Sequence, residues 1–459
     1  MKIITYRQAQ EYLESFIRPS VFERIKEDSH MQDPLDRMRV LLSLLGDPQK
    51  KFKSVQISGT SGKGSTSYLL NNILVRAGYK TGLATSPHLE RMTERMLINN
   101  LEIDEKKFVA LVQLLIPAIE KMKKLSEGEP SYFELLTALA FLHFTKEKVD
   151  IAVVEVGLEG KYDATNVLDP LVIIITNISK DHTELLGDTE QAIAGEVLSI
   201  VRNGETTSPI IVTGIMQDKL RKMVRERADD NGLVCKAFTD EFKITSIQSL
   251  DGGVEFDYEG KDLHLSKIYV SMRGEYQAVN AGLAVAATTS LKELGFTILD
   301  EHVRGGLSNA FFAGRFEIFT YVHGATSYTY ILDGAHNDAK MGAFLKALDH
   351  HYPDQAITYI VGFKKNKDST AMLRQLFSRK GTYILTQFHK GADYARSVSM
   401  TTSELKMNAD DAEKTFFMED VPSALNQAVQ LSGKVIVVTG SLYLVGEVRS
   451  ILMPRELCS

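Results

Sequence analysis

The chain has 459 residues, more than one ordinary hydrophobic core accommodates, so its length predicts two or three domains. Hydrophobic residues at 44% and charged residues at 24% are average for a soluble globular protein. The net charge of −6 excludes the basic footprint of a nucleic-acid-binding or membrane-surface protein, and two distant cysteines exclude a disulfide framework. No apolar run approaches the length of a membrane span. We therefore expect a cytoplasmic monomer that acts on small molecules, with no nucleic acid or membrane partner.

The chain begins with two predicted amphipathic helices, over residues 6–16 and 35–45, and then reaches a glycine-rich segment at 55–66. A β-branched run there is followed by three glycines, a lysine and two hydroxyl residues, namely Gly59, Gly62, Gly64, Lys63, Ser65 and Thr66. A helix is predicted from 67 to 77. Glycines let backbone N–H groups turn toward a phosphate, and the helix N-terminus adds partial positive charge.

This strand–loop–helix order predicts a phosphate cradle, in which Lys63 reaches the outer phosphates and Ser65 or Thr66 offers a hydroxyl to Mg²⁺. The match to the common pattern G-x-x-x-x-G-K-[ST] is imperfect, because Ile57 stands at its first glycine. The alternative is an ordinary glycine-rich turn between a strand and a helix.

Polar groups then follow successive predicted strands. A strand at 81–86 leads into a polar loop at 85–95, and a helix at 133–145 precedes the buried strand 151–155, which ends in Glu155. Another buried strand at 171–176 is followed by His182, and 209–213 is expected to close the sheet. The carboxyl ends of parallel strands face the ligand crevice, so Glu155 and His182 are predicted to bind a metal there. A structural histidine is the alternative for His182.

The period changes to alternation at 240–275, which predicts a small antiparallel appendage before a helix at about 277–294. Beyond a hinge-like segment at 309–315, further strands are predicted at 328–332, 356–361, 383–386 and 434–438. The prediction is an α/β protein. Residues 1–309 form a parallel-sheet ATPase domain with a phosphate loop and the β appendage, and residues 310–459 form a Rossmann-like α/β domain.

Eight motifs along the chain carry a resemblance: Gly59–Ser65, Thr85–His88, Glu155–Asn166, Asp181–Gly187, Gln277–Asn280, Gly314–Glu317, Asp333–Asn337 and Thr439–Gly446. In this order they resemble the folylpolyglutamate synthase/dihydrofolate synthase family of the Mur ligase superfamily. The resemblance implies ATP-dependent amide formation: a folate-type carboxylate takes the γ-phosphate of ATP, and L-glutamate displaces phosphate from the acyl phosphate. ATP and Mg²⁺ are the implied cofactors.

The resemblance also implies residue roles. The catalytic residues would be Lys63 on the phosphates with Glu155 and His182; Ser86 and Glu155 would bind a first Mg²⁺, and His182 would share a second with Glu155. The nucleotide would contact the loop residues Gly59, Thr60, Ser61, Gly62, Lys63, Gly64, Ser65 and Thr66, and further along Asn280, Arg315, Asp333 and His336. An ion pair between domains is the alternative for Arg315 and Asp333. The pteroate would contact Leu35, Asp36, Ser131, Tyr162, Asp163 and Ala164.

The chain departs from the family pattern at several positions. Pro34 replaces a glycine, and Glu159 and Lys161 replace a glycine and an arginine near the pteroate segment. The largest departure is Val197, where the family usually has a lysine that is carbamylated and bridges to the second Mg²⁺. Valine cannot bind a metal, and the adjacent Glu196 points about 100° away on a helix, which makes it a poor substitute.

Three functions remain open on the sequence. The first is glutamate ligation to a folate-type carboxylate, dihydropteroate or a tetrahydrofolate polyglutamate. The second keeps the ligase chemistry with a non-folate carboxylate, and the third is a nucleotide-binding protein with little ligase activity. Retention of Lys63, Ser86 and Glu155 favours an active ligase.

Overall fold

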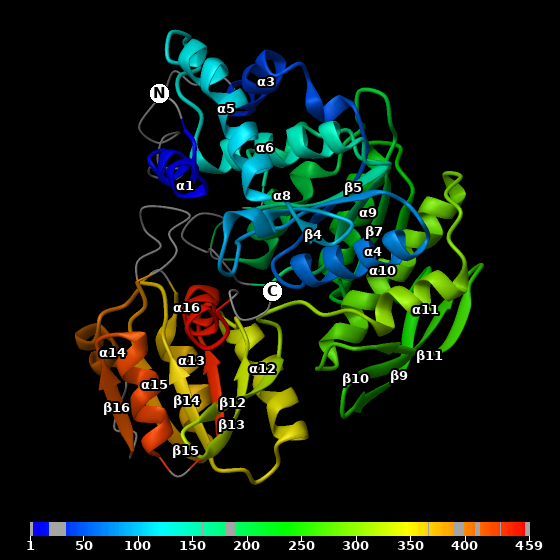
Figure 1. Cartoon of the computed structure of the whole chain (residues 1–459). Coiled ribbons are helices and arrows are strands. Elements are labelled where there is room, and N and C mark those ends of the chain that lie inside the picture. Colours follow the sequence, from blue (N-terminus) through cyan, green and yellow to red (C-terminus); the bar gives the residue numbers. More distant parts are fainter. Residues whose placement is uncertain are drawn as a thin grey trace. The chain divides into compact units, whose positions relative to one another are not determined.

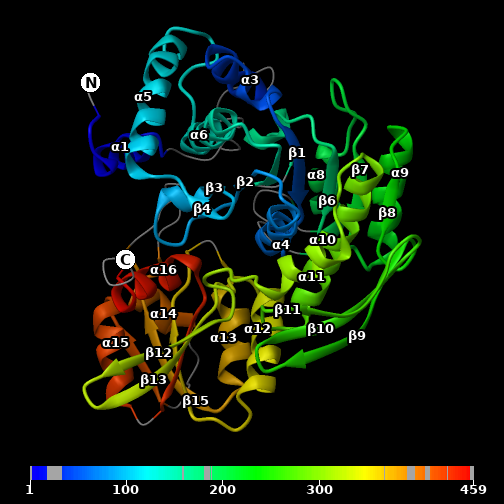
Figure 2. The ribbon, with the colours of Figure 1, turned by 45° about the vertical axis from the view of Figure 1, so that its right-hand side comes forward.

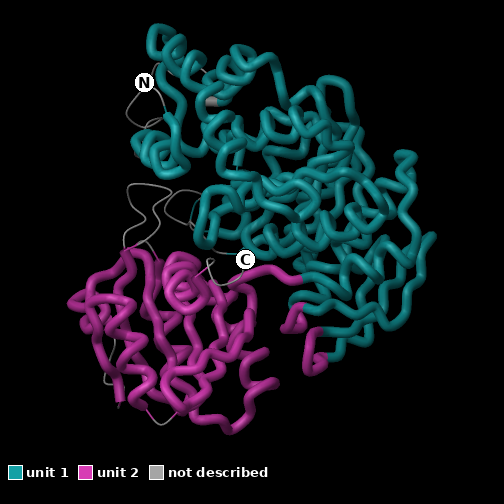
Figure 3. The backbone as a smooth tube through the Cα atoms, in the orientation of Figure 1, with its two compact units in different colours: residues 1–248, 254–271, 276–310 teal, residues 249–253, 272–275, 311–459 magenta. Residues whose placement is uncertain are grey.

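The computed structural model describes residues 3–17, 34–157, 160–179, 187, 189–365, 367–389, 399–408, 414–431 and 433–454. The chain forms two compact units (Figure 3). The first comprises residues 1–248, 254–271 and 276–310; the second comprises 249–253, 272–275 and 311–459. The main division after residue 310 lies within the hinge-like segment, while two short segments near the predicted appendage belong to the second unit.

An eight-stranded sheet forms the centre of the first unit (Figure 1). Its strands, in spatial order, are β4 (Leu101–Glu102), β3 (Met96–Ile98), β2 (Thr81–Ala84), β5 (Ile151–Glu155), β1 (Lys53–Ser58), β6 (Val172–Ile175), β7 (Ile210–Thr213) and β8 (Cys235–Ala237). The strands from β2 to β8 run parallel, and β3 and β4 turn back antiparallel at one edge. Strands β5, β6 and β7 are rich in valine and isoleucine, and β1 is buried at five of its six residues, as expected where helices cover both faces of a parallel sheet.

The strand order explains which helices cover which face of this sheet. The connection from β1 to β2 runs one way along the sheet and the later connections run the other way, so right-handed crossovers put their helices on opposite faces. On one face α4 (Lys63–Arg76) packs against β1, β2 and β5, next to α10 (Tyr276–Glu293) and α11 (Asp300–Ser308). On the other lie α6 (Tyr132–Glu147), α8 (Glu190–Val197) and α9 (Asp218–Asp230) (Figure 2). The ligand crevice of such a sheet lies outside the carboxyl ends of its strands, where the order reverses.

Further helices complete the first unit. An apolar core joins α6 to three more helices, α1 (Tyr6–Glu14), α3 (Pro34–Leu44) and α5 (Glu105–Met122). The loops contain four short helices, η1 (Pro48–Lys50), η2 (Met92–Arg95), η3 (Ala164–Val167) and η4 (Leu198–Ile200). Strands β9 (Phe242–Leu250), β10 (Gly253–Gly260) and β11 (His264–Val270) form a separate three-stranded sheet.

The second unit is built on a six-stranded sheet in the order β12 (Glu317–His323), β13 (Thr326–Leu332), β17 (Val435–Thr439), β14 (Ile357–Val361), β15 (Gly381–Thr386) and β16 (Thr415–Met418). All but the edge strand β12 are parallel. Its helices are α12 (Asp338–His351), α13 (Ser369–Phe377), α14 (Thr402–Asn408), α15 (Val421–Gln430) and α16 (Leu442–Leu452). This is a Rossmann-like arrangement.

The predicted fold class is confirmed: two α/β units, one with a parallel-dominant sheet, a phosphate loop and a β appendage. Two details were wrong. Strand 209–213 does not close the sheet, because β8 pairs beyond it, and the helix after the glycine-rich loop begins at Lys63 rather than at residue 67. Throughout the ranges given above, the structure contains no helix long and apolar enough to cross a membrane.

Candidate active site

The phosphate loop joins β1 to α4, and two of its glycines have backbone angles that favour glycine. Gly59 has φ +127° and Gly62, which precedes the first turn of α4, has φ +82°. A Cβ on Gly62 would lie 2.3 Å from Asn280 Oδ1, and one on Gly59 would lie 2.2 Å from Thr176 Oγ1. The backbone therefore approaches its neighbours as closely as a glycine permits.

Lys63 folds back over this loop, because its Nζ donates a hydrogen bond of 2.6 Å to the carbonyl oxygen of Gly59. Gly64 and Ser65 fall in the first turn of α4, where N–H groups have no partner within the helix, and Thr66 N donates to the carbonyl oxygen of Gly62 at 2.8 Å. The loop thus presents an ammonium group and the positive end of a helix at one place, which is the chemistry of a phosphate site.

Asn177, just after β6, holds the loop from the side. Its carbonyl oxygen accepts from Thr60 N at 3.0 Å, and its side-chain oxygen accepts from Ser61 N at 2.8 Å and Thr60 Oγ1 at 3.0 Å. Thr60 Oγ1 is also 2.8 Å from Ser179 Oγ. The sequence analysis missed this anchor, although a polar residue at the carboxyl end of a buried strand was a signal for it.

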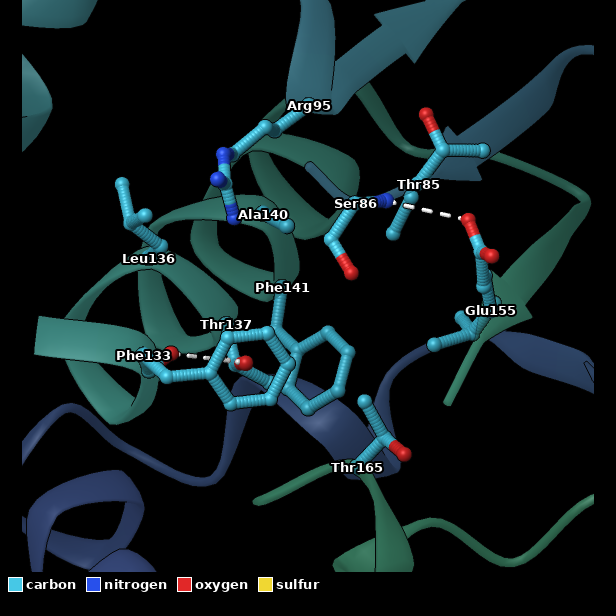
Figure 4. A pocket seen from close by; sticks show the side chains of 12 residues that line it. Thr85, Ser86, Arg95, Phe133, Leu136, Thr137, Ala140, Phe141, Glu155 and Thr165 are labelled. Atoms are coloured by element: carbon cyan, nitrogen blue, oxygen red, sulfur yellow. Dashed lines mark hydrogen bonds between the residues drawn. The ribbon is translucent and has the colours of Figure 1, made fainter. Parts of the chain in front are cut away.

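Glu155 ends β5, directly beside the phosphate loop, since it pairs in register with Ile57 of β1. It is buried, and its Oε2 accepts a 3.0 Å hydrogen bond from the backbone N–H of Ser86 (Figure 4). Two of the predicted metal-binding residues therefore lie together, on the ends of adjacent strands.

An open pocket of about 330 Å³ lies against this pair. Its apolar wall comes from α6, and its polar groups come mainly from strand ends; the lining residues are Ala84, Thr85, Ser86, Arg95, Phe133, Leu136, Thr137, Ala140, Phe141, Val154, Glu155 and Thr165. In Figure 4 the guanidinium of Arg95 extends into the space between Leu136 and Ser86. Arg95, buried yet directed into the pocket, and the ring of Phe133 are site residues that sequence reasoning did not single out.

The donor atoms near the phosphate loop fit Mg²⁺, a hard cation that takes oxygen ligands. The Ser86 hydroxyl and the Glu155 carboxylate are such donors, and Ser61 Oγ and Thr66 Oγ1 are buried with no hydrogen-bond partner in the part of the chain that the structure describes. Among the described residues no three His, Cys, Asp or Glu side chains are grouped to hold a metal. His182 lies outside those residues, so its role stays a prediction.

Val197 and Glu196 are neighbours in α8, but their side chains lie in different surroundings. Val197 is fully buried in an apolar cluster that includes Val156 and Ile178. Glu196 instead faces the loop after β5: a Cβ on Gly160 would lie 2.9 Å from its Oε2, which is buried and unpartnered among the described residues.

Of the predicted pteroate residues, Ser131 has a clear local role. Its hydroxyl accepts from Glu134 N at 3.3 Å and Glu134 Oε2 accepts from Ser131 N at 2.6 Å, a capping box that begins α6. Glu134 also forms a buried ion pair with Arg37 at 2.8 Å. These contacts fix the first turn of α6, which carries Phe133 into the pocket.

The other predicted pteroate residues lie in two parts of the chain, at or just before η3 and on α3. Asp163 is buried and accepts from Thr165 N and Oγ1, at 2.9 and 2.5 Å, and Thr165 Oγ1 in turn accepts from Gln56 Nε2 of β1 at 3.0 Å. Ala164 beside it is buried. On α3, Leu35 is buried, while Asp36 is half-exposed and pairs with Arg39. Tyr162 lies under the ammonium of Lys161, 5.4 Å from the ring centre.

The other predicted nucleotide residues lie in both units. Asn280 is in α10 of the first unit, where its Nδ2 donates to Gln277 Oε1 at 2.9 Å. Arg315, Asp333 and His336 all belong to the second unit, so an ion pair between Arg315 and Asp333 would not join the two units.

Asp333 ends β13 and organises the hinge-side loop. Its oxygens accept from Phe316 N and Ala335 N, each at 2.9 Å, and burial raises its pKa to about 6, partly offset by the charge of Arg315. His336 Nδ1 is 2.7 Å from the carbonyl oxygen of Gly334, and its Nε2 is 3.0 Å from Lys340 Nζ.

The fold and the site together define an ATP-dependent ligase of the Mur type: residues 57–288 match the model of the Mur ligase middle domain. Residues 317–452 match the model described as dihydrofolate synthetase, C-terminal domain.

The particular family follows from full-length similarity. The dihydrofolate synthase/folylpolyglutamate synthase of Bacillus subtilis (strain 168) is 30% identical over 419 residues, covering 90% of this chain and 94% of that protein. The Mycobacterium tuberculosis folylpolyglutamate synthase, solved with ADP and AMPPCP, has a TM-score of 0.86 at 28% identity and 99% coverage of both chains. A solved FPGS–AMPPCP–folate complex has a TM-score of 0.79 at 27% identity, covering 98% of this chain and 100% of that one. The chain therefore belongs to the folylpolyglutamate synthase/dihydrofolate synthase family, whose members are ATP-dependent ligases that join glutamate to folates.

Proposed function

We propose that this protein joins L-glutamate to a folate-type carboxylate, dihydropteroate or a tetrahydrofolate polyglutamate, with ATP as the energy source. The observation that carries the proposal is the juxtaposition at one sheet edge of the phosphate loop, the Ser86–Glu155 pair and a pocket with an aromatic wall and Arg95. The relatives solved with ADP, AMPPCP and folate support the same substrates.

The chemistry needs a carboxylate oxygen placed in line with the γ-phosphate of ATP, with the negative charge of both neutralised. Lys63 and the first N–H groups of α4 are suited to bind and orient the phosphates. Arg95 attracts the anionic acceptor, and Phe133 offers its ring to a planar heterocycle. The acyl phosphate formed by the transfer is then attacked by the amine of L-glutamate, with phosphate as the leaving group.

Ser86 and Glu155 would hold Mg²⁺, which supplies charge neutralisation on the phosphates when bound. A role for His182 at a second ion, and roles for Asn280, Arg315, Asp333 and His336 toward ATP, remain part of the proposal. The predicted contacts of Leu35, Asp36, Ser131, Tyr162, Asp163 and Ala164 with the acceptor are also part of the proposal. So are the predicted domain roles, the monomeric state and the cytoplasmic location.

The test is ADP formation from MgATP and L-glutamate with dihydropteroate, and separately with tetrahydrofolate, each with and without bicarbonate. We expect turnover with at least one acceptor, unaffected by bicarbonate, because Val197 cannot be carbamylated. Lys63→Ala removes the ammonium over the loop and is expected to abolish turnover; retained turnover would exclude the loop from the mechanism.

The same assay separates the two other candidates. No ADP formation with either folate, together with turnover on another carboxylate, would favour a Mur-type ligase with a different acceptor. The departures from the family pattern at Pro34 and Lys161 motivate this candidate. Nucleotide binding without turnover on any carboxylate would favour the nucleotide-binding protein with little ligase activity, which Val197 motivates.

A further inference from the structure

The loop between β2 and β3, residues 85–95, supplies polar groups to the pocket from both of its ends. Ser86 and Arg95 both line the pocket, although nine positions separate them along the chain. Only one backbone contact between the ends is close to hydrogen-bond length, Thr85 N to Arg95 O at 3.4 Å. Ser86 is held directly by Glu155, through its backbone N–H, whereas the position of the Arg95 side chain depends on what fixes the middle of the loop.

Glu94 fixes it. Its carboxylate accepts hydrogen bonds from three consecutive backbone N–H groups: Leu89 N at 2.7 Å, Glu90 N at 3.1 Å and Arg91 N at 3.0 Å. Three successive N–H groups that converge in this way form a nest for an anion, and here the chain supplies the anion itself. Charge-assisted bonds of this kind are about twice as strong as neutral ones.

The neighbours of Glu94 extend this anchor to the pocket. Arg95 Nε donates to His88 Nδ1 at 2.8 Å, so the residue after Glu94 is tied to the residue before the nest. On the outer side, Tyr6 of α1 accepts from Met92 N at 3.1 Å. The guanidinium of Arg95 is thus oriented by a loop whose shape Glu94 determines.

We infer that Glu94 is a positioning residue for the ligase reaction: through its three backbone contacts it holds Arg95 at the geometry that receives the acceptor carboxylate. It does not line the pocket and is not a catalytic residue. The inference rests on the proposed function for its substrate, but the anchor itself is a property of the loop.

The test compares Glu94→Gln with Thr93→Val. Glutamine has nearly the same shape but no charge, and its NH₂ group faces N–H donors that need an acceptor. Thr93→Val removes a different side-chain bond of the same turn, Thr93 Oγ1 to Glu102 Oε2 at 2.6 Å, and leaves the nest intact. For Glu94→Gln we expect the KM of the folate acceptor to rise about tenfold, with the KM of ATP within about twofold of the unmodified value. Thr93→Val is expected to change neither by more than about twofold.

Equal changes in both KM values, an unchanged acceptor KM, or the same acceptor effect from Thr93→Val would overturn the inference. If Glu94→Gln does not fold, hydrogen exchange on the unmodified protein still tests the inference. The amides of residues 89–91 should be protected from exchange, and unprotected exchange there would show that Glu94 does not hold the loop. Absence of turnover by the unmodified protein would refute the proposed function alone, because the exchange measurement does not require activity.

Discussion

The close approach of Gly62 to Asn280 makes a quantitative prediction about the nucleotide site. Gly62→Ala puts a side chain into a backbone with φ +82°, which costs roughly 1–2 kcal/mol for an L-residue. The new Cβ would lie 2.3 Å from Asn280 Oδ1, so Asn280 must move and lose its bond to Gln277, worth about 1 kcal/mol. The expected total is about 2–3 kcal/mol.

Gly78 provides a matched control at the opposite end of α4. Its φ is +88°, nearly that of Gly62, but a Cβ there would meet nothing within 4 Å. Gly78→Ala therefore reports the backbone strain alone, and the difference between the two variants isolates the collision with Asn280.

Thermal unfolding and calorimetric titration with ADP measure both effects. We expect Gly62→Ala to lower Tm by about twice as much as Gly78→Ala, and to weaken ADP binding at least about tenfold, because the displaced loop no longer directs its N–H groups at the phosphates. Equal Tm shifts, or unchanged ADP affinity in Gly62→Ala, would refute the reasoning that this contact shapes a nucleotide cradle.

Three further predictions concern buried ionisable side chains. Arg37→Met strands the Glu134 carboxylate and should cost about 3–5 kcal/mol in denaturant unfolding, whereas Arg39→Met at an exposed pair should cost less than about 1 kcal/mol. Burial lowers the pKa of His143 to about 4, below its unfolded value, so stability is full above about pH 6.5 and falls toward pH 4. Unfolding at pH 7 and pH 5 should therefore differ by about 2 kcal/mol from this group, a difference that His143→Leu removes. Because the pKa of Asp333 is raised to about 6, its protonation should weaken ADP binding as the pH falls through 6, and Asp333→Asn should reduce that pH dependence while weakening binding at pH 7.

Much of the fold was predictable because its signals are local. Strands β6 and β7 are almost entirely valine and isoleucine, and the glycines before Lys63 mark the turn into α4, so these elements were found from the sequence. Strands β8, β12 and β16 were missed because they lie at the edges of their sheets and are only partly buried, so none forms a long apolar run. Length and burial there depend on pairing partners far away in the chain.

The site was predictable only in part, for a related physical reason. Glu155 was predicted from its place at the end of a buried strand and Ser86 from the family resemblance, and the structure places the two side by side. The capping box of Ser131 and Glu134 was visible as an S-x-x-E pattern, yet the hydroxyl was interpreted as a substrate contact. Arg95 was not singled out because nothing in the sequence shows that the chain folds back and brings it next to Ser86.

Two loops of this site are held in the same way, by a side-chain oxygen that accepts hydrogen bonds from backbone N–H groups. In the phosphate loop Asn177 accepts bonds from Thr60 and Ser61, and in the loop between β2 and β3 Glu94 accepts from three consecutive amides. Neither anchor contributes a side chain to the pocket. Several residues that would contact substrates, among them Thr60, Ser61 and Ser86, sit on loops, where ordering the backbone costs about 1–2 kcal/mol per residue. Side-chain oxygens bound to main-chain N–H groups offset that cost, so the precision of the site depends on residues that the substrate-contacting motifs do not contain.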